Sequence, residues 1–285
     1  MTLHRIAAVA LLAWCVSAAA ATAPPARPTT MPALSMQQII EKNVAARGGL
    51  QAWRNVESMT WSGHVQATSE PTPMPFIMEL QRPNKTHFEI ATADKHFARI
   101  FDGTRGWRMR PGGNGMPELK PFSNAEVAFS RDEFVIDGPL IDYGAKGVSA
   151  KLVGLDEIDG RKAYLLEVTL PGGAGRRIWV DAETFLDVRC DRPSTSPLTK
   201  GAAVSVYYRD FRVVDGLLIP HTIETRSSSG DGPSQMLAIE KIELNPPLPV
   251  QAFAKPPVPK QRSSKAVVRI GNNPVAPGAA TGVVR

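Results

Sequence analysis

The feature that most constrains the fold of this chain is an alternation of apolar and polar residues with a period of two. Met59, Trp61 and Val65 alternate with polar residues, and the run from Met74 to Leu80 repeats the pattern. Successive side chains of a β-strand point to opposite faces of a sheet, so this period is typical of strands with one buried face. The chain is therefore predicted to be mainly β.

Tight turns separate the predicted strands. Asp-Gly pairs begin at residues 102, 137, 159, 215 and 231, and Asn114-Gly115 has the same chemistry. These residue types tolerate the positive φ angles that two-residue hairpin turns require. The best hairpin candidates pair residues 148–158 with 162–170, and 204–214 with 217–226. With further strands at 177–181, 186–190 and 235–244, about ten or eleven strands are expected to form one large curved antiparallel meander.

Few helices accompany these strands, so the fold is of the α+β kind with β dominant. Ser35 to Gln38 has the form of a capping box and begins a helix over 36–47, which Gly48-Gly49 ends. A short helical turn over 50–55 follows, and a third helix is predicted over 124–135. Two or three helices are few to cover about ten strands. An incompletely covered concave face would form an apolar pocket.

The two ends of the chain differ from its body. Residues 1–21 combine a short polar start, an apolar run and small residues, and therefore predict a secretory signal that is cleaved near Ala21. Residues 22–34 form a Pro-rich leader, and residues 257–285 a basic tail that we expect to be disordered. The folded domain is predicted to span 35–256.

The charge distribution argues against nucleic-acid binding. The chain has 33 basic and 27 acidic residues and a formal charge of +6. One of the basic residues lies in the predicted signal and five lie in the tail, so the stretch 22–256 is neutral. A nucleic-acid domain would concentrate Lys and Arg on one face. The tail instead suits peripheral contact with an anionic envelope surface.

Motifs of catalysis and metal binding are missing from the sequence. It has no nucleophile elbow, no phosphate loop, and no His or Cys pairs at metal-ligand spacing. His87 and His96 are interpreted as solvated surface residues, and Cys190 as a buried small hydrophobe. We therefore expect no cofactor, no metal and no enzymatic activity. A hydrolase whose groups come together only in space is the third-ranked alternative.

Apolar side chains on the predicted strands are the candidate ligand-binding residues. Each of them has an alternative role as an ordinary core residue that packs against the helices. The candidates are Trp61, Phe76, Met78, Leu80, Phe88, Ile90, Phe101, Trp107, Trp179 and Tyr208.

Four segments resemble a known family. They are MQQIIEKNVAARGGLQAWRNVESMTWSGHV, FDGTRGWRM, YYRDFRVVDGLLIPHTIETRSS and AIEKIELNPPLPVQAFAKP, with a frame of Tyr208, Asp215-Gly216, Pro220 and Asn245-Pro246. Residues 35–256 thus resemble the LolA/LolB-like superfamily of periplasmic outer-membrane lipoprotein-sorting proteins. The resemblance implies an open half-barrel of about eleven antiparallel strands. Helices would cover its concave side, and apolar residues there would accept acyl chains.

The resemblance also implies a function. It favours a periplasmic, non-enzymatic carrier of lipid or lipoprotein acyl chains that meets an envelope protein partner transiently. The family's carriers depend on an arginine in an early strand that helps control the lid; Arg82 and Arg99 lie in early strands here, without the family's sequence context. The alternative is an envelope interaction module whose sheet encloses a filled core.

Overall fold

A computed structural model describes residues 34–93, 95–113, 116–133, 135–194, 203–228 and 234–257. The compact unit that begins at Ser35 contains every helix and strand presented below. The predicted signal peptide and its cleavage point, the Pro-rich leader up to residue 33 and the basic tail from residue 258 lie outside the described residues. So do the Asn114-Gly115 and Asp231-Gly232 turns.

Thirteen strands form one sheet within the described ranges. Their bounds are β1 (Ser58–Ala67), β2 (Met74–Gln81), β3 (Lys85–Ala91), β4 (His96–Phe101), β5 (Gly106–Pro111), β6 (Pro117–Pro121), β7 (Ser149–Ile158), β8 (Arg161–Thr169), β9 (Gly175–Asp181), β10 (Asp187–Pro193), β11 (Ala203–Val214), β12 (Leu217–Ser227) and β13 (Gln235–Leu244). The mainly β class of the sequence analysis is confirmed.

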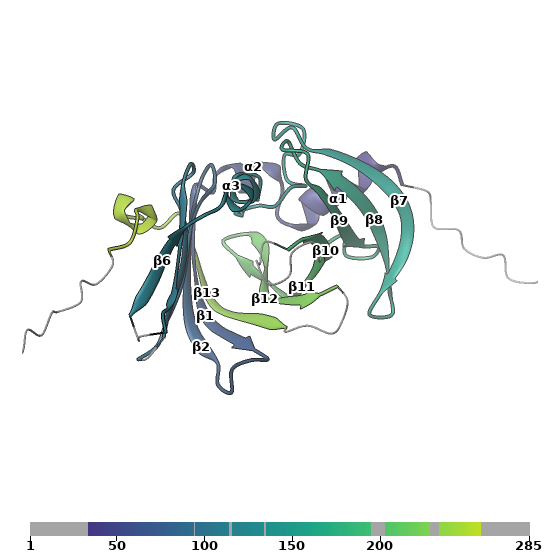
Figure 1. The fold of residues 1–285 in the computed structure, drawn as a ribbon. Helices are drawn as coiled ribbons and strands as arrows, with labels where there is room; N and C mark the ends of the chain where they lie inside the picture. Colours follow the sequence, from purple (N-terminus) through teal and green to yellow (C-terminus); the bar gives the residue numbers. More distant parts are fainter. Residues whose placement is uncertain are drawn as a thin grey trace, which may run out of the picture. The chain divides into compact units, whose positions relative to one another are not determined.

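The sheet is an open antiparallel meander. Its strand order is β6-β5-β4-β3-β2-β1-β13-β12-β11-β10-β9-β8-β7, so β1 pairs with the last strand, and β6 and β7 are the two edges. An antiparallel sheet that curves but is not closed agrees with the expected half-barrel (Figure 1). It has more strands than the expected eleven. One addition is β6, which has no apolar alternation and carries a proline at each end, as an edge strand tolerates.

In the part of the chain that the structure describes, three α-helices lie on one side of this sheet (Figure 1). They are α1 (Met36–Ala46), α2 (Leu50–Arg54) and α3 (Asn124–Arg131), and a 3₁₀ turn, η2 (Val250–Phe253), follows β13. The Ser35–Gln38 capping box is confirmed, and Ser123 and Glu126 form a second one at α3. The third helix is four residues shorter than predicted. It gives way after Arg131 to a connection of turns whose Ile136, Leu140 and Ile141 are buried.

The two best hairpin candidates are confirmed. Asp159 and Gly160 have φ of 51° and 78°, and Asp215 and Gly216 have 47° and 85°. Both residues of each turn therefore occupy the left-handed region that a two-residue hairpin of this kind needs. Each turn lies directly between paired strands, β7 with β8 and β11 with β12.

The main core lies between the helices and β1, β2, β12 and β13. Met59, Val65, Leu80 and Leu217 are at most 1% exposed there. Gly63 is required where β1 meets β13, because a Cβ at this position would lie 2.0 Å from the carbonyl oxygen of Ala238. The register between the two strands shifts at the same point. No helix in the described part of the chain is long and apolar enough to cross a membrane.

Candidate ligand-binding site

A cavity of about 250 Å³ lies between the sheet and the connection that follows α3. We call it the central cavity. Its walls come from β1, β2 and β9 to β13, from Arg47 at the end of the first helix, and from Glu133, Val135, Gly138 and Pro139. Its apolar lining consists of Trp61, Met78, Val135, Pro139, Ile178, Val206, Phe211, Ile219, Pro220, Ile223 and Leu237. Its volume is slightly below the range of about 300–1,000 Å³ that small-molecule pockets usually span.

Strand register explains how distant residues meet in this cavity. Trp61 is the cross-strand partner of Met78, and Ile223 is the partner of both Tyr208 and Leu237. Cross-strand partners point to the same face of a sheet. We call this face, which also carries the helices, the inner face.

Trp61 lines the central cavity and carries a polar atom that is unpaired. Its residue is 8% exposed, and its Nε1 is buried with no hydrogen-bond partner among the described residues. A buried polar group without a partner costs free energy, commonly about 1–3 kcal/mol.

A charged cluster occupies the β9–β10 side of the central cavity. Nη2 of Arg176 lies 2.9 Å from Oε2 of Glu133, and Nε of Arg192 lies 4.0 Å from Oε1 of the same carboxylate. Both guanidinium groups also lie over the ring of Phe129 in α3, at 5.8 and 5.0 Å from its centroid. The cluster therefore fixes the start of the connection against the sheet.

Two further titratable groups in this wall stay neutral. Burial raises the pKa of the Cys190 thiol to about 12. Burial also raises the pKa of the Tyr208 hydroxyl above its usual range. Both residues line the central cavity. Near neutral pH the tyrosine is therefore a hydrogen-bond donor, and the cysteine behaves as a small apolar group, as the sequence predicted.

Helix α1 is held to β10 by polar contacts at the rim. Nη1 of Arg47 lies 3.2 Å from Oδ2 of Asp187, and Nδ2 of Asn43 donates to Oδ1 of the same carboxylate at 3.1 Å. Arg47 also donates to the backbone oxygen of Asp137 at 3.0 Å. The side chain of Asp137 in turn receives hydrogen bonds from Arg82 and Lys146. These contacts join α1, the connection and the end of β2.

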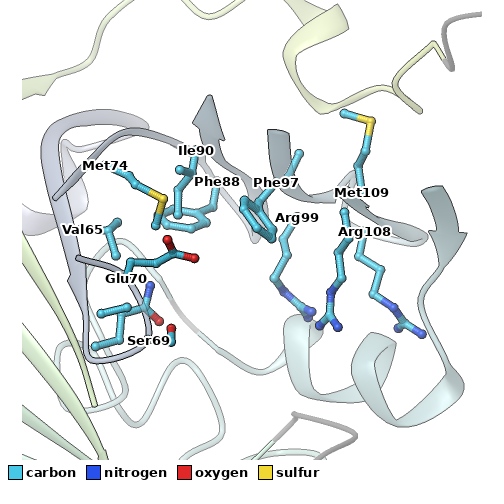
Figure 2. A pocket seen from close by; sticks show the side chains of 14 residues that line it. Val65, Ser69, Glu70, Met74, Phe88, Ile90, Phe97, Arg99, Arg108 and Met109 are labelled. Carbon is cyan, nitrogen blue, oxygen red and sulfur yellow. The ribbon is translucent and has the colours of Figure 1, made fainter. Parts of the chain in front are cut away.

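A second hollow of about 260 Å³ lies on the inner face toward β4 and β5 (Figure 2). We call it the outer groove. Its apolar floor is formed by Val65, Met74, Phe88, Ile90 and Phe97. Charged side chains of Glu70, Arg99, Arg108 and Arg110 also line it. Figure 2 shows Arg99 and Arg108 extending side by side, away from Met109.

These two arginines hold α3. Nη1 of Arg99 lies 3.3 Å from Oε1 of Glu126, and Nη1 of Arg108 contacts Oε2 of the same carboxylate. Burial on its own would raise the pKa of Glu126. Hydrogen bonds from Ser123 and Arg108, together with the charge of Arg99, outweigh burial and lower that pKa. Glu126 therefore remains ionised as it anchors the helix.

Comparison with known proteins addresses the fold. No protein-family model and no curated protein sequence matches the chain. A LolA superfamily protein from Nitrosomonas europaea superposes with a TM-score of 0.51 and 16% identity, over 78% of this chain and 99% of that protein. The fold is LolA-like. This confirms the architecture that the sequence resemblance implies.

Two other solved structures have lower TM-scores. A DUF1329 family protein from Desulfovibrio piger has a TM-score of 0.49 and 12% identity, over 76% of this chain and 96% of that protein. A putative outer membrane lipoprotein-sorting protein domain from Vibrio parahaemolyticus has a TM-score of 0.42 and 12% identity, over 76% and 95% of the two chains.

The LolA-like sheet brings half of the sequence-predicted residues to its two hollows. Trp61, Met78 and Tyr208 line the central cavity. Phe88 and Ile90 line the outer groove. These five residues lie on the inner face, as an acyl-binding site would require.

Three other predicted residues are core residues of the inner face. Phe76 is 4% exposed and lies against Phe88, with ring centroids 5.8 Å apart. Leu80 is 1% exposed within the main core. Phe101 is fully buried and stacks on Phe122 at 6.5 Å, just before α3.

Trp107 and Trp179 lie on the opposite face of the LolA-like sheet. Trp179 follows Ile178, which lines the central cavity, and packs instead with Ile158 and Ala163 in a separate cluster. Arg189 covers its ring at 4.4 Å, and its Nε1 donates to Asp156 at 2.8 Å. Trp107 precedes the inner-face residue Arg108 and pairs across strands with Ile100. Neither tryptophan lines the hollows.

Sequence reasoning missed the charged cluster. Arg176 lies two residues before Ile178 on β9, and Arg192 lies two residues after Cys190 on β10, so each arginine points to the same face of the sheet as that apolar residue. This spacing was the one sequence signal for the cluster, because it places a cation on a strand face that is otherwise apolar. Glu133 comes from the connection and offered no such pattern.

His87 differs from expectation, whereas the side chain of His96 is 38% exposed. His87 was predicted to be solvated, yet its side chain is 14% exposed and lies 2.8 Å from Glu79 and 3.1 Å from Glu89. His96 lies 2.8 Å from Glu89, so the two histidines share one carboxylate. Within the described ranges, no group of three or more His, Cys, Asp or Glu side chains is placed to hold a metal ion.

Proposed function

We propose that this protein is a non-enzymatic binder or carrier of acylated ligands, and that it takes acyl chains into the central cavity. The observation that carries the proposal is the cavity itself, an apolar hollow between the inner face and the connection after α3. Burying an acyl chain there would contribute about 0.8 kcal/mol per CH₂ group. A filled core, which the alternative interaction module requires, would leave no such space.

The fold gives further support. The Nitrosomonas europaea protein with the same fold is described as a LolA superfamily protein. Together with the predicted signal over 1–21, this supports a place in the bacterial envelope. We propose a periplasmic location, lipid or lipoprotein acyl chains as ligands, and a transient envelope protein partner.

The proposal includes an opening movement of the helices and of the connection after α3, which together cover the central cavity. The cavity is slightly smaller than typical ligand pockets, so a long chain needs more room than the closed arrangement gives. Ion pairs such as Arg47 with Asp187 and Arg99 with Glu126 hold the helices and the connection against the sheet, together with buried residues of the main core. Separation of the connection from the sheet would enlarge the cavity.

Titration of a fluorescent fatty acid, with native mass spectrometry of protein purified from the envelope, tests this function. Ile223→Trp fills the central cavity and is expected to weaken binding at least tenfold. The matched control is Ile77→Trp, because Ile77 is 38% exposed and lies away from both hollows. Thermal unfolding checks that both variants fold. Absence of both fatty-acid binding and co-purified lipid would overturn the proposal.

A further inference from the structure

The central cavity carries an unbalanced positive charge. Five charged side chains of the described residues line it: Arg47, Arg176, Arg192, Glu133 and Asp187. Three are cations and two are anions. Burial also raises the pKa of the Asp187 carboxyl, so burial disfavours the negative charge of this residue. An apolar cavity with a surplus cation is an environment that favours an anion.

The hydrogen-bonding groups in this wall are mainly donors. Arg176 and Arg192 carry only donors, and the Tyr208 hydroxyl stays protonated. Acceptors in the wall, such as Glu133, are already engaged by arginine. A ligand that suits the cavity therefore presents acceptor atoms.

Arg176 is a built part of the wall and not a surface residue. Its side chain is 6% exposed, and it lies between Glu133 and the ring of Phe129. Its neighbour Arg177 points to the other face, is 60% exposed and pairs with Glu167. The two adjacent arginines thus have opposite environments. A charge-assisted hydrogen bond in a water-poor site is stronger than one at the surface.

We propose that the central cavity recognises an acyl chain that ends in an anionic head group, with Arg176 and Arg192 binding the anion. This rests on the proposed function, because it names the class of acyl ligand. The small volume favours a ligand with a single chain. A carboxylate and a phosphate share the required chemistry, so a fatty acid and a monoalkyl phosphate are the two sources to distinguish.

Calorimetric titration with four ligands of equal chain length tests the proposal, each used below its micelle-forming concentration. The ligands are dodecanoate, dodecyl phosphate, 1-dodecanol and dodecyltrimethylammonium. We expect an anion to bind roughly tenfold more tightly than the alcohol, since a charge-assisted hydrogen bond contributes that much. The cation is expected to bind most weakly. The tighter of the two anions identifies the head group.

Three variants test whether the preference for anionic ligands depends on the charged residues of the cavity wall. Arg192→Gln is expected to lower affinity for the anion roughly tenfold and to leave 1-dodecanol unchanged. Glu133→Gln is expected to raise affinity for the anion severalfold, because it removes the carboxylate that competes for both arginines. Arg177→Gln, on the opposite face, is the matched control and should change neither. The opposite signs of the first two effects separate charge recognition from simple damage to the fold.

The outcomes distinguish this inference from the function on which it rests. If none of the four ligands binds, the proposed acyl-binding function fails. If 1-dodecanol binds as tightly as both anions, the function stands and the inference is wrong. Equal losses for the anion and the alcohol in Arg192→Gln would also overturn it, because they would indicate a structural role alone.

Discussion

Nη2 of Arg82, directly after β2, lies 2.8 Å from Oδ2 of Asp137 in the connection that follows α3. Nζ of Lys146 lies 2.6 Å from the other carboxylate oxygen, and the whole Asp137 residue is 3% exposed. One buried carboxylate therefore holds two cations from different parts of the chain. This carboxylate fixes the segment that covers the central cavity.

Asp137→Asn is expected to destabilise the protein by about 3 kcal/mol, because it leaves two partly buried cations facing a neutral amide. Urea unfolding followed by tryptophan fluorescence measures the change. Glu240→Gln is the control, since its ion pair with His64 is exposed and should contribute less than about 1 kcal/mol. Similar losses in the two variants would show that Asp137 has no special role.

Glu126 gives α3 a dependence on pH. Its pKa in the folded protein is lowered, mainly because the hydrogen bonds from Ser123 and Arg108 and the charge of Arg99 outweigh burial. In the unfolded chain the pKa of a glutamate is about 4.3, and a lower pKa in the folded protein stabilises the fold at pH values above that. This stabilisation is lost as the pH falls through the pKa of the folded state. Stability should therefore decline below about pH 4.3.

Glu126→Gln tests this dependence. The variant is expected to be less stable than the wild type at pH 7, by about 1–2 kcal/mol, because the charge-assisted hydrogen bonds are lost. The difference between the two proteins should shrink as the wild-type carboxylate is protonated. Chemical unfolding at pH 7, 5 and 3 measures both. A constant difference across this range would contradict the assignment.

How far the sequence alone predicts this molecule depends on how local each signal is. The Asp159-Gly160 hairpin and the Ser35–Gln38 cap were predicted correctly, because each structure is determined by a few neighbouring residues. Helix α3 was predicted too long. The residues after Arg131 are instead held by Asp137 contacts with distant residues, which no local pattern reveals.

The candidate site was harder to predict than the fold. Ile178, Trp179 and Val180 are all apolar, so alternation does not show which of them faces the cavity. The structure places Ile178 there and Trp179 on the other face. Arg176 and Arg177 are likewise the same residue type, yet the side chain of Arg176 is buried and that of Arg177 is exposed. Side-chain direction is set by register across the whole sheet, and a single strand does not encode it.

Cys190 offers a chemical test of the cavity wall. Burial raises its pKa to about 12, so the reactive thiolate is scarce at pH 8. In a protein that begins at Thr22, Cys190 is the only cysteine. We expect it to react with a disulfide reagent such as DTNB far more slowly than a free thiol does. In guanidinium chloride the same sample should release one equivalent, and rapid reaction of the native protein would contradict the burial.

The basic tail is expected to act apart from the folded domain. It carries Lys260, Arg262, Lys265, Arg269 and Arg285 and no acidic residue. Each base near an anionic membrane surface contributes about 1 kcal/mol of attraction, which salt screens. Deletion of residues 258–285 should therefore reduce binding to anionic lipid vesicles at low salt and leave acyl-ligand affinity unchanged. Vesicle sedimentation at two salt concentrations, with the ligand titration, measures both effects.

The structure sets where that deletion must stop. Phe253 in η2 is 2% exposed, and Nζ of Lys85 in β3 lies 5.8 Å from the centre of its ring. A deletion that begins at Val250 removes this buried ring and is expected to cost about 3–5 kcal/mol of stability, as loss of a buried phenylalanine usually does. A deletion from residue 258 spares it and should leave the unfolding midpoint unchanged. If the shorter deletion also unfolds the protein, the tail is part of the folded domain, and the expectation that the basic tail acts apart from it is wrong.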